Sequence, residues 1–206
     1  MAPAAAGRFV VLEGADASGK STQAALLVER LRALGRDVVL TFEPGATETG
    51  AAIRTLLLHA AGSIDPLTEA LLLAADRAQE VADIVRPALA RGADVVSDRY
   101  VPSSLAYQGV GRGLGVEKVE RLNRWTTGGL EPDVVVVLDV DEAVATSRRA
   151  VPGDRLERAG AEFHAAVRSA YRSLAVERGW ALVDGNADVD VVAERIWSAL
   201  RERLGL

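Results

Sequence analysis

The sequence predicts an α/β domain in which a parallel sheet is covered by helices on both faces. Short β-branched strings alternate with longer amphipathic segments along the chain, an order typical of strand–helix–strand units. The strings are continuous apolar runs, as expected for strands that are buried on both faces. Because the 206 residues fall within the usual range of one domain, roughly 50 to 250, we expect a single domain over residues 1–206.

Five apolar strings predict the strands of this sheet. They are rich in valine, which favours strand over helix because a β-branched side chain packs well on a pleated surface. The strings are "FVVLE" (9–13), "DVVLT" (37–41), "ADVVS" (93–97), "DVVVVLDV" (133–140) and "WALVD" (180–184).

Three longer segments between or after the strands predict amphipathic helices. In the first, leucines recur at helical spacing and Gly35 is a C-terminal stop signal. In the second, Asp65 is the expected N-cap and Pro66 occupies the first helical position. The segments cover residues 21–35, 64–89 and 187–204.

Composition narrows the class of protein. Hydrophobic residues make up 49% and charged residues 26%, which is ordinary for a globular chain with a sizeable core. The formal net charge of −5 argues against a nucleic-acid polymer as partner, because such binders usually carry a basic excess. The absence of cysteine excludes a disulfide framework, a thiolate metal site and a cysteine nucleophile.

No segment predicts export or membrane insertion. The string "MAPAAAGR" at the beginning lacks the basic region and the apolar stretch of a signal peptide. The most apolar run, "VVVVL", is far shorter than the roughly 20 residues that span a bilayer. We therefore expect a cytoplasmic protein without a membrane partner.

The strongest motif is a phosphate-binding loop. The string "GADASGKS" matches Gly-x-x-x-x-Gly-Lys-Ser/Thr, with a predicted strand before it and a predicted helix after it. Such a loop turns backbone N–H groups around an anion, and the following helix adds the positive end of its dipole. Lys20 is expected at the β- and γ-phosphates and Ser21 at Mg²⁺. The predicted ATP-binding residues are Gly14, Ala15, Asp16, Ala17, Ser18, Gly19, Lys20, Ser21 and Thr22.

Asp16 is unusual in an anion cradle, because a carboxylate there repels phosphate unless it points away. It could accept a hydrogen bond from a sugar hydroxyl or pair with a basic group near a second substrate. The alternative is a solvated aspartate in a turn, where Asp is common.

A second candidate site follows the third strand, in "SDRYVPSSLAYQGVGRG". Side chains at the carboxyl end of a parallel strand face the crevice where ligands bind in such sheets. Asp98 is placed to hold Mg²⁺, and Arg99 is placed to clamp a second phosphate through its guanidinium fork. A surface ion pair is the alternative for an isolated Asp-Arg string, and the position after a strand favours the binding role.

Further arginines lie in three other segments. Arg54 lies beyond the loop "TFEPGAT", and Arg77 lies in the otherwise apolar helical segment around "AADRAQ". A buried arginine needs a partner, so Arg77 either pairs with Asp76 or another acid or faces a polar ligand such as a nucleobase. The string "SRRAVPGDRLERAG" is either a solvated charged face or a loop that closes over the transferred phosphoryl group.

Taken together, the motifs resemble those of bacterial thymidylate kinase (dTMP kinase) over nearly the whole chain. The motifs that carry the resemblance are "LEGADASGKSTQ", "EPGAT", "AADRAQ", "DRYVPSSLAYQGVGRG", "PDVVVVLDV" and "DRLE" followed by "EFHAAVRSAYRSLA". The resemblance implies a phosphate-loop α/β sandwich with a five-stranded parallel sheet, usually as a homodimer. It also implies transfer of the ATP γ-phosphoryl group to dTMP, giving dTDP, with Mg²⁺.

The resemblance further assigns roles to individual residues. It implies that Asp16 bonds the acceptor 3′-hydroxyl, that Arg54 and Arg99 hold the acceptor phosphate, and that Tyr107 discriminates against a 2′-hydroxyl. The implied acceptor-site residues are Asp16, Phe42, Pro44, Arg54, Leu73, Arg77, Arg99, Ser103, Ser104, Tyr107 and Gln108; the metal residues are Ser21 and Asp98. Members differ in whether the catalytic arginine lies in the phosphate loop or in a lid. Ala17 occupies the loop position here, which indicates a lid over about 147–160. The implied catalytic residues are Lys20, Arg99, Arg148, Arg149 and Arg155.

Three positions depart from the family pattern. Phe42 stands where an arginine is common, Ala46 where a second glycine usually lies, and Leu73 where a phenylalanine usually stacks on the base. Loss of an aromatic face weakens stacking that is worth about 1–3 kcal/mol per base in single-strand binders, and Phe42 is a candidate to compensate. A kinase for another or modified pyrimidine monophosphate therefore remains an alternative.

Two other classes of protein fit less well. A deoxynucleoside kinase would need a carboxylate base, for which Glu13 is the candidate, but its usual Glu-Arg-Ser string is replaced here by Asp98, Arg99 and Tyr100. A GTPase or ATPase switch would need a guanine-reading Asn/Thr-Lys-x-Asp string, which the sequence lacks. A switch would also leave the second arginine site unexplained.

Overall fold

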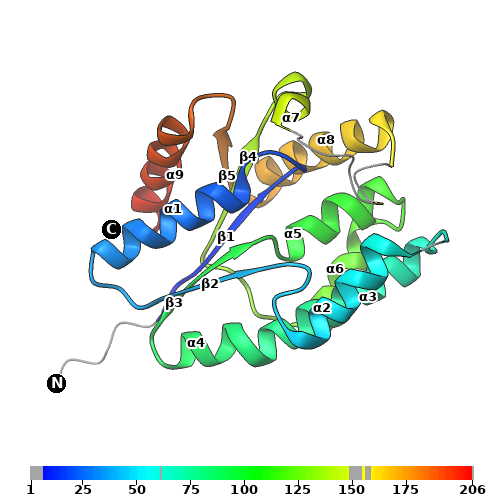
Figure 1. The fold of residues 1–206 in the computed structure, drawn as a ribbon, viewed down its shortest axis with the longest axis horizontal. Coiled ribbons are helices and arrows are strands. Elements are labelled where there is room, and N and C mark those ends of the chain that lie inside the picture. Colours follow the sequence, from blue (N-terminus) through cyan, green and yellow to red (C-terminus); the bar gives the residue numbers. More distant parts are fainter. Residues whose placement is uncertain (1–6, 61, 149–154, 156–158, 206) are drawn as a thin grey trace.

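The strands of the computed structural model form one parallel sheet in the order β2-β3-β1-β4-β5 (Figure 1). The structure describes residues 7–60, 62–148, 155 and 159–205. All five strand predictions are confirmed, with small shifts at the ends. The strands are β1 (Phe9–Gly14), β2 (Val38–Phe42), β3 (Asp94–Asp98), β4 (Val134–Asp139) and β5 (Ala181–Asp184).

Helices join the strands and cover the sheet. Gly35, with a φ of +80°, follows the first helix as predicted, and Asp65 caps the third through its side chain. The helices are α1 (Lys20–Ala33), α2 (Glu48–His59), α3 (Pro66–Glu80), α4 (Arg86–Ala90), α5 (Val101–Ser104), α6 (Val116–Thr126), α7 (Glu142–Arg148), α8 (Ala161–Arg178) and α9 (Val189–Leu204). Two π-helical segments, η1 (Val81–Val85) and η2 (Leu105–Gly111), interrupt this series.

The sheet is the middle layer of three. Helices α1 and α9 cover one face, and α4, α5 and α8 lie over the other (Figure 1). Along β1, Val10 and Leu12 belong to the core on the α1 side, while Phe9 and Val11 belong to the core on the opposite side. A strand buried on both faces needs apolar side chains at every position, which explains the continuous run in the sequence.

The topology places a crevice at the carboxyl end of β1. This strand lies between β3 and β4, so the chain crosses from one half of the sheet to the other. Ligands bind at such a switch point, outside the carboxyl ends of the strands. The phosphate loop follows β1 directly and therefore lies at this position.

The segment predicted as one helix over residues 64–89 is divided into α3, η1 and α4. Pro87 has no backbone N–H to donate to the carbonyl four residues earlier, and the wider π-helical turn lies just before it. The second π-helical segment, η2, carries Tyr107 and Gln108. Such turns are frequent at functional sites because they re-aim side chains.

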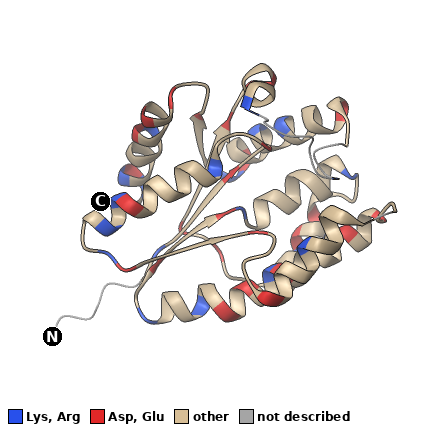
Figure 2. Ribbon diagram, viewed as in Figure 1, with Lys and Arg blue, Asp and Glu red and all other residues tan. Residues whose placement is uncertain are grey.

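Charged residues of both signs are interspersed along the helices (Figure 2). None of the described helices combines the length and the apolarity needed to cross a membrane.

Candidate active site

A cavity of about 490 Å³ opens at the carboxyl ends of the strands. It extends from the phosphate loop to helices α3 and α5, and it brings together most residues that the sequence predicts for the site. The predicted residues that line it are Asp16, Ala17, Lys20, Ser21, Phe42, Pro44, Arg54, Leu73, Arg77, Asp98, Arg99, Ser103, Ser104, Tyr107 and Gln108.

The phosphate loop has the backbone that its glycines predict. Gly14 and Gly19 have φ values of +141° and +93°, and Ala17 also lies in the left-handed region, with a φ of +62°. Lys20 Nζ donates to Ala15 O at 2.8 Å and to Ser18 Oγ at 3.3 Å. Burial, together with the charge of Arg99, lowers the pKa of Lys20 to about 8. The lysine is thus held inside the loop with its charge poorly solvated, a state that a bound phosphate would stabilise.

The two predicted metal residues meet in the structure. Ser21 Oγ, at the beginning of α1, donates to Asp98 Oδ2, at the end of β3, over 2.5 Å. The other carboxylate oxygen of Asp98 is buried without a hydrogen-bond partner among the described residues. Mg²⁺ prefers oxygen ligands, so this hydroxyl and carboxylate fit a magnesium ion.

Asp16 pairs with Arg99, and this contact joins the phosphate loop to the end of β3. Arg99 Nη2 lies 2.5 Å from Asp16 Oδ1, and Arg99 Nη1 donates to Gly14 O at 3.2 Å. Burial favours the protonated form of Asp16, but the charges of Arg99 and Lys20 overcome it and lower the pKa of Asp16. Asp16 is therefore an ionised acceptor, and its Oδ2 is buried without a partner among the described residues.

The backbone of Arg99 is strained, with a φ of +80° that few non-glycine residues adopt. Buried Glu13 supports the segment that follows, because its carboxylate accepts from Tyr100 N at 2.8 Å and from Ser103 Oγ at 2.7 Å. Tyr171 Oη donates to the same carboxylate at 2.8 Å. Glu13 is 0% exposed and is not among the described residues that line the cavity.

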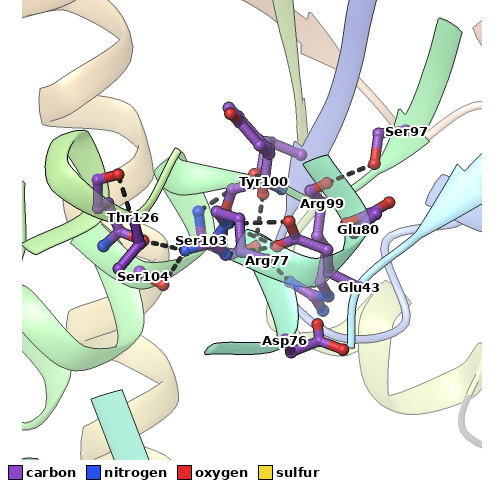
Figure 3. Close-up of polar contacts among 12 residues, drawn as sticks. Glu43, Asp76, Arg77, Glu80, Ser97, Arg99, Tyr100, Ser103, Ser104 and Thr126 are labelled. Carbon is purple, nitrogen blue, oxygen red and sulfur yellow. Dashed lines mark hydrogen bonds and ion pairs between the residues drawn. The ribbon is translucent and has the colours of Figure 1, made fainter. Parts of the chain in front are cut away.

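Arg77 pairs with Glu43, which the sequence reading did not single out (Figure 3). Arg77 Nε lies 2.9 Å from both carboxylate oxygens of Glu43, and both side chains are almost fully buried. Arg77 also donates to Ser104 Oγ at 2.9 Å and contacts the amide oxygen of Asn123. Asp76 instead accepts from Gly45 N at 3.0 Å. Of the alternatives for Arg77, the structure shows pairing with an acid other than its neighbour, beside the cavity wall.

Phe42 and Leu73 approach the cavity from different sides of the sheet edge. Phe42 is in register with Asp98, and alternation along β2 places it on the same face as Val38, which packs in the α1-side core. Thr41 points to the opposite face, where its hydroxyl contacts Glu80 of α3. Phe42 and Leu73 both line the cavity, and the expectation that Phe42 replaces the missing aromatic at position 73 stays a prediction.

The predicted lid is only partly described. Arg149 lies outside the described residues, as do residues 150–154 and 156–158. Arg148 Nη2 donates to Gly185 O at 3.0 Å, beside the phosphate loop. Arg155 Nε donates to Leu57 O at 2.7 Å and its Nη2 lies 2.6 Å from Glu69 Oε2. The two described arginines therefore lie on opposite sides of the cavity.

Four buried polar residues around the site, Glu43, Glu69, Glu80 and Asn123, were missed by sequence reasoning. Each of them contacts a predicted site residue or a neighbour of one. Glu43 stands directly before Pro44, in the loop "TFEPGAT" next to predicted site residues, so its position was a usable signal. Glu69, Glu80 and Asn123 lie on helical segments, where a glutamate or asparagine is usually expected to face solvent.

Comparison with known proteins agrees with these motifs. The family model for thymidylate kinase matches residues 12–196. The thymidylate kinase of Leifsonia xyli subsp. xyli is 50% identical over 202 residues, which cover 96% of each chain. The thymidylate kinase of Deinococcus radiodurans is 44% identical over 201 residues, covering 96% of this chain and 98% of the relative. That of Synechococcus sp. strain JA-2-3B'a(2-13) is 46% identical over 200 residues, covering 96% of each chain.

The backbone conformation of the phosphate loop lets us predict how substitutions at its small residues change the stability of the fold. A Cβ at Gly14 would lie 2.6 Å from Leu138 O and 2.8 Å from Ser18 Oγ, in a backbone conformation that side chains rarely adopt. Gly14→Ala should therefore lower the free energy of unfolding by about 1–3 kcal/mol, as measured by urea denaturation. Ala17→Gly is the matched control and should stay within about 1 kcal/mol of wild type, because glycine accepts a positive φ. Equal stability of the wild type and Gly14→Ala would contradict the geometry.

Proposed function

The chain belongs to the thymidylate kinase family, and from this premise we propose that it transfers the γ-phosphoryl group of ATP to dTMP, giving ADP and dTDP. The observation that carries the proposal is the single cavity in which a phosphate loop and the separate arginine Arg99 meet. A nucleotide hydrolase needs only the phosphate loop. A kinase for a monophosphate needs the phosphate loop for the donor and a separate cation such as Arg99 for the acceptor phosphate.

On the donor side, we propose that the loop amides and Lys20 bind the β- and γ-phosphates of ATP. Lys20 exchanges its contacts with Ala15 O and Ser18 Oγ for the phosphate oxygens. Ser21 and Asp98 hold Mg²⁺, which neutralises charge on the phosphates when it is bound. The proposal is supported by the 2.5 Å contact between the two side chains and by the unpartnered oxygen of Asp98.

On the acceptor side, we propose that Arg99 and Arg54 hold the phosphate of dTMP. Asp16 keeps Arg99 in place through Oδ1, and its unpartnered Oδ2 accepts a hydrogen bond from the 3′-hydroxyl of the sugar. Ser104 donates its hydroxyl to the thymine at the far end of the cavity, and Arg77, whose own N–H groups are engaged, holds Ser104 in place. Tyr107 and Gln108 line the sugar and base. Leu73 contributes an apolar contact to the base in place of an aromatic one.

The chemistry requires positioning and charge neutralisation more than proton transfer. The acceptor phosphate is already an anionic nucleophile, so a strong general base is unnecessary. The buried position of Glu13 agrees with this scheme, because its carboxylate is engaged by Tyr100, Ser103 and Tyr171. A deoxynucleoside kinase, which would need such a base at the sugar hydroxyl, is therefore disfavoured.

The choice of acceptor is tested by ADP release with dTMP, dUMP, UMP, CMP and thymidine as acceptors. We expect dTMP to give the highest kcat/KM and thymidine to give no turnover, because thymidine lacks the phosphate that Arg99 and Arg54 would bind. Chelation of Mg²⁺ with EDTA should abolish the activity. Turnover with thymidine and with no monophosphate would overturn the proposal. A preference for another pyrimidine monophosphate would keep the reaction type and change the substrate.

We propose that a lid arginine stabilises the charge that spreads over the transferred phosphoryl group. Ala17 brings no cation into the loop, whereas Arg148, Arg149 and Arg155 follow β4 in the chain. Substitution of the catalytic arginine by alanine should lower kcat by at least about 100-fold with little change in ATP affinity. Each of the three is replaced in turn, with exposed Arg121→Ala of α6 as the control. Unchanged kcat in all three variants would remove the lid from the mechanism.

We also propose that the enzyme is a homodimer, as the resemblance implies. Three large apolar side chains, Leu56 of α2 and Leu67 and Leu71 of α3, are about half exposed. The two helices lie side by side (Figure 1). Light scattering should give twice the mass of one chain, and Leu67→Glu with Leu71→Glu should give a monomer. Val176→Glu on α8 is the control, because that exposed side chain lies on another helix. A monomeric wild type would contradict the proposal.

A further inference from the structure

Glu80, the last residue of α3, is a buried acid to which the proposed mechanism gives no role. It is 2% exposed and lies between α3 and the edge strand β2. The hydroxyl of Thr41 on β2 donates to its Oε1, and its Oε2 has no hydrogen-bond partner among the described residues. Such a group is costly to bury, so its environment must either neutralise it or pair it.

The cluster holds more acids than cations. Arg77 is fully buried, and its Nε and Nη2 atoms are directed at the carboxylate of Glu43. Its remaining contacts are with Ser104 Oγ, the amide oxygen of Asn123 and the carbonyl oxygen of Tyr100. No Arg77 donor is directed at Glu80. One guanidinium therefore neutralises one carboxylate, and the second carboxylate needs a proton.

Burial and Glu43 outweigh the groups that favour an ionised Glu80. Burial and the negative charge of Glu43, on the segment after β2, raise the pKa of Glu80 to about 10, while Arg77 of α3 only partly opposes them. Tyr100, after β3, adds no charge, because burial raises its pKa. Burial and the negative charge of Glu43 also raise the pKa of Asp76 of α3, to about 6 (Figure 3). Asp76 interacts with Gly45 in the adjoining loop.

We propose that Glu80 is a positioning residue for recognition of the acceptor base, which it serves as an uncharged carboxyl group. It accepts from Thr41 and lies against the Glu43 carboxylate without repelling it. Arg77, which pairs with Glu43, is in this way held at the wall of the cavity. This inference rests on the proposed function for its link to the base. An ionised Glu80 would compete with Glu43 for Arg77 and repel the Glu43 carboxylate.

The protonation of Glu80 is tested without any assay of activity. An acid whose pKa rises from its ordinary value of 4.5 to about 10 on folding holds a proton that the unfolded chain releases between these pH values. Wild type therefore loses stability relative to Glu80→Gln as the pH increases. The ratio of their unfolding constants, from urea denaturation at pH 6, 7 and 8, should increase about tenfold per pH unit. The ratio for exposed Asp83→Asn, the control from η1, should stay constant. A constant ratio for Glu80→Gln would show an ionised Glu80 and overturn the inference.

The positioning role is tested by kinetics with dTMP and ATP. Glu80→Gln should keep KM for dTMP within about threefold of wild type, because the amide is neutral and of the same size. Glu80→Ala should raise KM for dTMP at least about tenfold with KM for ATP unchanged. Thr41→Val removes the contact with Glu80 by a smaller change and should also raise KM for dTMP. This variant provides the test if Glu80→Ala does not fold.

A folded Thr41→Val and a folded Glu80→Ala with unchanged KM for dTMP would overturn the positioning role. A large increase of KM in Glu80→Gln would also overturn it, because the uncharged mimic would then have failed. A wild type without activity on dTMP would instead refute the proposed function, and the pH series on stability would still report the state of Glu80.

Discussion

The arrangement of the site depends on one partly buried guanidinium, that of Arg99. It pairs with Asp16 of the phosphate loop, contacts Gly14 O, and lies 3.1 Å from Ser103 Oγ of α5. Three segments far apart in the sequence are thus fixed to one another by a group that is ionised at any physiological pH. The strained φ of Arg99 is maintained because these contacts and the support from Glu13 determine the local backbone. In the proposed function, the donor and acceptor subsites are connected through this guanidinium.

The electrostatics differ at the far end of the cavity, away from the phosphate loop. There Arg77 is fully buried, and Glu43 cancels its charge before any ligand arrives. Arg99 is also paired, with Asp16, but Lys20 and Arg54 line the same cavity and add positive charge there. In the proposed function, this excess of cations suits a phosphate, and the neutralised pair at α3 suits an uncharged base. Glu80 is left without a cation of its own, because the nearby guanidinium of Arg77 is paired with Glu43.

The sequence predicted the sheet and the phosphate loop well because both rest on local patterns. Continuous valine runs marked the strands, and the spacing of Gly14, Gly19 and Lys20 marked the loop. Pairings between segments that are far apart in the chain could not be predicted from the sequence. The pairing of Arg77 with Glu43 has no signal within a short window, whereas Pro87 was a local signal for the division of the long helix. The face of β2 on which Phe42 lies depends on the strand's neighbours rather than on residue type.

Transfer of a labelled phosphoryl group tests the central claim most directly. The enzyme is mixed with γ-labelled ATP, Mg²⁺ and dTMP in a single turnover, and the products are separated by chromatography. The account predicts that the label moves to dTDP in an amount equal to the ADP formed, with little inorganic phosphate. Label found in inorganic phosphate alone would contradict the account, because the cavity would then serve ATP hydrolysis without an acceptor.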